Sequence, residues 1–163
     1  MTGSAPRWLD AAEQTAWRAY YEAYQMVMRD LQGDLQATVG LLSLAEYDVL
    51  VRLTEAPDNR LRMSELASYT VTSRSRLSHQ ISRMESDGLV RRESCDTDRR
   101  GAYAVLTPVG VRRLELAAPH HVESVRCRLL AAFTPEEFQQ LGHLSAKLVD
   151  HLEVASSEEA VAS

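Results

Sequence analysis

One order of segments within residues 60–106 restricts the fold more than any other feature: a short strand, a short helix, a turn, a second helix and two strands. In residues 73–87 apolar side chains recur at helical spacing and form one face: Leu77, Ile81 and Met84. Gly88 follows as the left-handed residue that commonly ends a helix. The pattern predicts a helix-turn-helix followed by a β-hairpin.

The flanking segments can be assigned from helix caps and alternation. Residues 89–93 and the segment around Tyr103 and Val105 read as strands, joined by a polar loop at 94–101. Ser64 is the expected cap of the short helix 65–69, and Thr107 and Pro108 open a later one. Capping boxes are expected at three other helix starts: Asp10 with Glu13, Ser43 with Glu46, and Thr134 with Glu137.

These elements predict a mostly α fold with a small β-hairpin wing, a winged helix-turn-helix with terminal dimerisation helices. The 163 residues suit one domain. We expect its parts as follows: a DNA-binding lobe at 40–107, dimerisation helices at 8–37 and 108–153, and a disordered tail at 154–163.

Charge is unevenly placed along the chain. The net charge of −5 argues against a nucleic-acid partner, yet residues 60–100 carry nine arginines and six acids. Arginine suits bidentate contact with phosphate or guanine. This clustering therefore favours a local DNA-binding surface.

The polar face of residues 73–87 is the first part of that surface. Short and basic side chains lie in its first turn, opposite the apolar face or on its flanks: Ser73, Arg74, Ser75, Arg76, Ser78, His79, Ser82 and Arg83. Short serines allow a close backbone approach to DNA, and arginines donate to bases or phosphates.

The hairpin is the second part. Asp98, Arg99 and Arg100 lie at its expected tip, where an arginine held by a carboxylate can enter the minor groove. Arg91 and Arg92 on the incoming strand are expected to meet phosphates.

Other classes of protein find little support. The chain has no apolar run of the ~20 residues that span a bilayer and no secretory signal pattern, and two cysteines are too few for a disulfide framework. We therefore expect a cytoplasmic protein without a membrane partner. No nucleophile-elbow, phosphate-loop or His-Glu-x-x-His motif indicates an enzyme, and no cofactor is expected.

With these residues in view, the chain resembles the MarR (multiple antibiotic resistance regulator) family of winged helix-turn-helix transcriptional regulators. The resemblance is dense over about residues 40–115 and rests on six segments: 44–50, 63–67, 73–78, 83–92, 98–100 and 105–110. It implies a homodimer that binds double-stranded DNA at a short inverted repeat. It also implies a repressor that releases DNA when a small aromatic or phenolic ligand binds. Side chains of the first two helices are candidates to line that pocket or to pack in the dimer core: Trp17, Tyr20, Tyr24, Met28 and Tyr47.

Three alternatives stay open. Cys95, beside arginines, is a candidate redox sensor. His120, Glu123 and Cys127 share one helix face and could bind zinc, although we expect no metal. A winged helix can also serve as a protein-interaction module, which would not need basic residues at the wing tip.

Overall fold

The computed structural model describes residues 6–39, 42–69, 73–95 and 98–161, with the side chains at 39, 98–100 and 156–161 excepted. It divides into two compact units, Met1–Glu123 and Ser124–Ser163, which are described separately. The helices are α1 (Ala11–Val39), α2 (Leu44–Glu55), α3 (Met63–Tyr69), α4 (Arg74–Ser86), α5 (Pro108–Arg128) and α6 (Pro135–Val161). The strands are β1 (Arg60–Arg62), β2 (Val90–Cys95) and β3 (Asp98–Leu106), with short 3₁₀ turns at Pro57–Asn59 and Leu130–Ala132.

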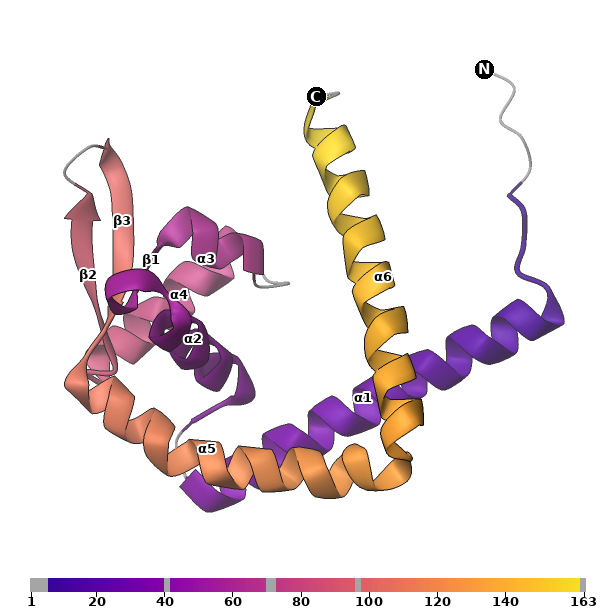
Figure 1. Ribbon diagram of the computed structural model, residues 1–163. Coiled ribbons are helices and arrows are strands. Elements are labelled where there is room, and N and C mark those ends of the chain that lie inside the picture. The colour runs from indigo at the N-terminus through magenta and orange to yellow at the C-terminus, as the bar shows by residue number, and fades with distance from the viewer. Residues whose placement is uncertain (1–5, 40–41, 70–72, 96–97, 162–163) are drawn as a thin grey trace. The chain divides into compact units, whose positions relative to one another are not determined.

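The first unit contains the expected winged helix-turn-helix. Its sheet has the order β1-β3-β2, with both pairs antiparallel. The β2–β3 hairpin stands beside α3 and α4 (Figure 1). The fold class predicted from the sequence is confirmed.

An apolar core packs the elements of this lobe together. Leu77, Ile81 and Met84 of α4 are buried, as their spacing predicts. Leucines of α2 and α3 and strand residues complete it: Leu50, Leu53, Leu66, Val90 and Ala104. Burial of these side chains fixes the rotation of α4 about its own axis, so that its polar face points to solvent.

The three expected capping boxes are present. Ser43 accepts from the Glu46 amide, while the Glu46 carboxylate accepts from the Ser43 amide. Asp10 with Glu13 and Thr134 with Glu137 make the same reciprocal bonds. Each pair satisfies amides that a helix start leaves without partners.

Four boundaries differ from the sequence interpretation. The loop expected at 94–101 is wrong, because β2 continues to Cys95 and pairs there with Asp98. Helix α3 begins at Met63, so Ser64 is not its cap. Helix α1 runs on to Val39, and α6 runs to Val161, past the residue at which the tail was expected to begin. Residues 154–161 contain no glycine or proline, and nothing there ends a helix.

A tight joint connects the end of α4 to the start of α5. Gly88 adopts φ +71°, and the Thr107 hydroxyl donates to its carbonyl at 2.6 Å. The Thr107 amide donates to the Leu89 carbonyl at 3.1 Å, and its hydroxyl accepts from the Gly110 amide at 3.0 Å. Thr107 is therefore the expected cap of α5, and it also fixes where the hairpin returns to the helices.

A helix that crosses a bilayer must be both long and apolar. Within the described ranges, none of the helices meets both conditions.

Candidate nucleic-acid interface

The exposed face of α4 is the centre of the site. Ser73 caps the helix, since its hydroxyl accepts from the Arg76 amide at 3.4 Å, and it lies 3.1 Å from the Ser75 hydroxyl. All but one of the expected side chains on this helix are exposed, and Ser82 is half-buried: Ser73, Arg74, Ser75, Arg76, Ser78, His79 and Arg83 are exposed. The face expected from the 100° periodicity thus points to solvent.

The serines of this face use their hydroxyl protons within the helix. Ser82 donates to the Ser78 carbonyl and Ser86 to the Ser82 carbonyl, each at 3.0 Å. Their oxygen atoms remain acceptors, and their short side chains project little from the helix surface. Such a surface allows close approach to a groove.

The arginines of α4 are available to an outside partner. Within the described part of the chain, no carboxylate lies within ion-pair distance of Arg74, Arg76 or Arg83. Three cations on one exposed helix face, without carboxylate partners in the described ranges, raise the local positive potential. This arrangement suits a polyanion.

The wing arginines have different surroundings. Arg91 is 56% exposed and pairs with Glu93, which also lies 3.8 Å from Arg60. Asp98, Arg99 and Arg100 are strand residues at the start of β3, not loop residues, and their side chains lie outside the described part of the structure. The arginine held by a carboxylate at the wing tip therefore stays a prediction.

Arg92 does not lie as the sequence suggested. Its side chain is 31% exposed, and its guanidinium donates to the Ser78 carbonyl at 2.9 Å. The neighbouring Nη1 lies 3.4 Å from the Glu85 carboxylate. In this conformation the guanidinium is bound to α4, so the phosphate contact expected for Arg92 stays a prediction.

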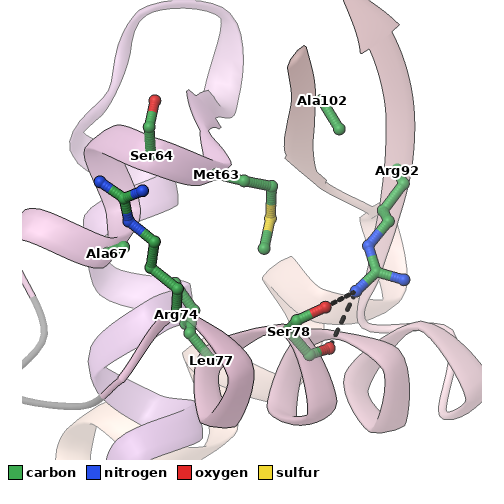
Figure 2. A pocket seen from close by; sticks show the side chains of 8 residues that line it. All are labelled: Met63, Ser64, Ala67, Arg74, Leu77, Ser78, Arg92 and Ala102. Carbon is green, nitrogen blue, oxygen red and sulfur yellow. Dashed lines mark hydrogen bonds between the residues drawn. The ribbon is translucent and has the colours of Figure 1, made fainter. Parts of the chain in front are cut away.

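Sequence reasoning missed a hollow between α3, α4 and the wing. Its volume is about 340 Å³. Eight residues line it: Met63, Ser64, Ala67, Arg74, Leu77, Ser78, Arg92 and Ala102. The side chain of Met63 points into the space between Arg74 and Arg92 (Figure 2). No local pattern could have indicated it, because its walls come from four separate elements.

The aromatic residues proposed for a ligand pocket lie in two environments. Trp17, Tyr20 and Tyr24 are about half exposed on α1, and Met28 is 37% exposed. Tyr47 is buried, with its ring 4.4 Å from that of His121. Burial raises the pKa of Tyr47 and lowers that of His121. The chain by itself does not enclose these five side chains together.

The redox and zinc alternatives gain no support from the geometry. Cys95 is buried, with its sulfur 4.0 Å from the Tyr103 hydroxyl, so an oxidant has little access to it. Cys127 is exposed. Among the described residues, no group of three histidine, cysteine or acidic side chains could hold a metal ion, and this includes His120, Glu123 and Cys127.

Comparison with known proteins agrees with this geometry. The MarR family model matches residues 42–101. The crystal structure of AbsC, a MarR family transcriptional regulator from Streptomyces coelicolor, is 44% identical and superposes with a TM-score of 0.83. The match covers 91% of this chain and 99% of the AbsC chain. A second MarR family regulator from the same organism, solved in complex with DNA, is also 44% identical, with a TM-score of 0.84 and coverage of 90% and 92%. The homoprotocatechuate degradative operon repressor of Escherichia coli is 32% identical over 66% of this chain and 71% of its own length. The resemblance inferred from the sequence is confirmed, and this chain belongs to the MarR family of transcriptional regulators.

Proposed function

We propose that this chain is a sequence-specific DNA-binding repressor that acts as a homodimer and responds to a small aromatic ligand. The observation that carries the proposal is the exposed face of α4, where three arginines with no carboxylate partner among the described residues accompany short serines and His79. The DNA complex of a 44% identical relative supports the partner. The operon repressor among the relatives supports repression of transcription as the output.

In this proposal α4 enters the major groove and the β2–β3 hairpin approaches the neighbouring minor groove. Arg74, Arg76 and Arg83 meet phosphates or guanines, while Ser75 and His79 read base edges. Arg91, Asp98, Arg99 and Arg100 contribute from the wing. A two-fold dimer would place two α4 helices about 34 Å apart, which requires an inverted repeat. Because its partner is the genome, the protein would act in the cytoplasm.

A homodimer is supported by apolar side chains that each unit leaves exposed. In the first unit Trp17 stacks on Tyr21 along α1, and both rings remain about half exposed. In the second unit Leu144, Leu148 and Leu152 recur at helical spacing on α6 and are exposed. Stripes of this kind on long helices are typical of surfaces that a second chain covers.

The DNA-binding proposal is tested by selecting genomic fragments with the purified protein. Wild type should enrich a short inverted repeat, and the Arg76→Ala/Arg100→Ala double variant should not. Arg18→Ala, which removes an exposed arginine from α1, is the matched control and should enrich the same fragments. If wild type enriches nothing at moderate salt, the lobe is a protein-interaction module instead.

Single variants then separate the roles of individual residues. Arg100→Ala should reduce the slope of log K against log salt by about one if the side chain contacts a phosphate. Ser75→Ala or His79→Ala should change preference at one base position by about 1–3 kcal/mol. A uniform loss across all sequences would show that the reading face lies elsewhere.

For the ligand we propose the hollow beside α4 as the binding site. The Arg74 guanidinium, which has no carboxylate partner among the described residues, and the Met63 thioether suit a small aromatic anion. Benzoate should raise the melting temperature of the wild-type protein more than neutral benzamide does. Met63→Trp, which fills the space, should abolish the difference. If Tyr24→Ala abolishes it and Met63→Trp does not, the ligand binds at α1, as the aromatic residues there first suggested.

A further inference from the structure

Strand β2 is attached to the recognition helix α4 at two points by one residue. The Arg92 guanidinium donates from Nη2 to the Ser78 carbonyl at 2.9 Å and lies 3.4 Å from the Ser78 hydroxyl. The main-chain amide of Arg92 donates to the Glu85 carboxylate at 2.9 Å, and Nη1 lies 3.4 Å from the other carboxylate oxygen. The carboxylate thus accepts from both the backbone and the side chain of Arg92. Figure 2 shows the Arg92 guanidinium turned down onto Ser78.

The two contacts come from different turns of the helix. Ser78 and Glu85 are seven residues apart, so they share one face of α4 about two turns from each other. The Glu85 side chain spans part of this separation, so that one guanidinium reaches both residues, and a strand held at two turns of a helix has little freedom to rotate about either. The attachment therefore sets the angle between the hairpin and α4 as well as their distance.

Arg92 differs in this respect from the other arginines of the site. Arg74, Arg76 and Arg83 have no described carboxylate partner, and Arg91 is paired only at the wing surface with Glu93. Arg92 has both terminal nitrogens engaged on α4. To reach a phosphate it would have to release these bonds.

We propose that Arg92 and Glu85 are positioning residues, which hold the wing at the angle to α4 that simultaneous major- and minor-groove contact requires. This inference rests on the proposed DNA binding. It adds that an acidic residue of the recognition helix increases affinity for DNA.

The sign of the Glu85 effect separates positioning from direct contact. A carboxylate near a polyanion repels it, so its removal strengthens binding if geometry is unchanged. If Glu85 acts through Arg92, its removal weakens binding instead. Arg92→Lys gives a second contrast, because lysine keeps the charge for a phosphate contact but lacks the fork that reaches both Ser78 and Glu85.

The experiment measures operator affinity for wild type, Arg92→Lys, Glu85→Ala and Glu85→Gln, with Asp87→Ala as the matched control. Asp87 is an exposed acid at the end of the same helix, and its replacement should leave affinity unchanged or raise it. We expect Arg92→Lys and Glu85→Ala each to weaken binding by about tenfold, the order of one lost specific contact. Glu85→Gln should fall between Glu85→Ala and wild type, because its amide oxygen still accepts from the Arg92 amide.

A double-mutant cycle tests whether Arg92 affects DNA affinity by placing the wing or by its own phosphate contact. If Arg92 acts by placing the wing, Arg92→Ala should cost less in the Arg100→Ala background than in wild type, because one of the contacts that it positions is already lost. Independent phosphate contacts would give additive losses. Additive losses, wild-type affinity for Arg92→Lys, or tighter binding by Glu85→Ala would each overturn the positioning role.

A measurement without DNA keeps this inference distinct from the proposed function. Arg92→Ala and Glu85→Ala should each speed amide hydrogen exchange in residues 90–95 and 98–104, with unchanged helix content by circular dichroism. If wild type binds no DNA, the proposed function fails while the exchange result still decides whether Arg92 and Glu85 hold the wing. Unchanged exchange in both variants would refute the attachment itself.

Discussion

Replacing Gly110 with alanine should destabilise the protein, although alanine is the better helix former. Gly110 lies in the first turn of α5, and a Cβ atom there would be 2.2 Å from the Leu89 carbonyl oxygen and 2.7 Å from Leu106 Cδ1. The leucine tip can turn aside, but the carbonyl belongs to the backbone. It also accepts from the Thr107 amide, and the Thr107 hydroxyl lies 3.0 Å from it.

The expected magnitude follows from these opposing terms. Overpacking costs about 1–3 kcal/mol, and a strained hydrogen bond costs about 1 kcal/mol more. The gain in helix propensity returns about 0.5–1 kcal/mol. We therefore expect a net loss of about 2 kcal/mol, which for a chain of this length lowers the melting temperature by about 4–8 °C.

The assay is thermal and urea denaturation followed by circular dichroism at one protein concentration, because the stability of a dimer depends on concentration. Gly33→Ala is the matched control, since Gly33 lies in α1 and nothing is within 4 Å of its added Cβ. That variant should be more stable than wild type by about 0.5–1 kcal/mol. If both variants are stabilised alike, the close contact at Leu89 does not exist and the joint between the hairpin and α5 is looser than described.

Three other predictions concern a helix cap, the proposed dimer and a half-buried histidine. Ser43→Ala should lower the unfolding free energy by about 1 kcal/mol in urea denaturation, because it removes the cap of α2; Thr38→Ala, which removes a hydroxyl bonded within its own helix, should change little. Leu148→Glu should yield monomers in analytical ultracentrifugation, because it places a charge on the apolar stripe of α6, whereas the exposed neighbour change Lys147→Glu should leave dimers. Burial lowers the pKa of His121 from its usual 6.5, so below that pH the unfolded chain takes up a proton that the folded chain does not. Stability should therefore be fully present above pH 6.5 and fall as the pH drops below it, and His121→Phe should flatten melting temperature against pH between 7.5 and 5; an equal slope in both proteins would contradict this origin.

Much of the fold could be predicted because its signals are local. The capping boxes at Asp10, Ser43 and Thr134 each depend on residues three positions apart, and all three form. The apolar spacing of α4 likewise fixed which of its side chains point outward. Most of the candidate interface could therefore be predicted from the sequence, because once one face of a helix is buried, the residues of the opposite face must be exposed.

The extent of the hairpin and the surroundings of its arginines needed the tertiary structure. Residues 94–101 look like a loop in isolation, yet pairing with β3 carries β2 to Cys95, since a strand ends where its partner ends and not where its composition changes. Arg91 and Arg92 are adjacent and alike in sequence, but alternation along a strand sends them to opposite faces. Arg91 meets Glu93 at the wing surface, while Arg92 meets Ser78 and Glu85 on α4. The amino-acid sequence alone determined that this chain carries a basic recognition helix and a basic wing. Only packing, which decides what lies against each face, determined that one arginine of the wing holds the two together.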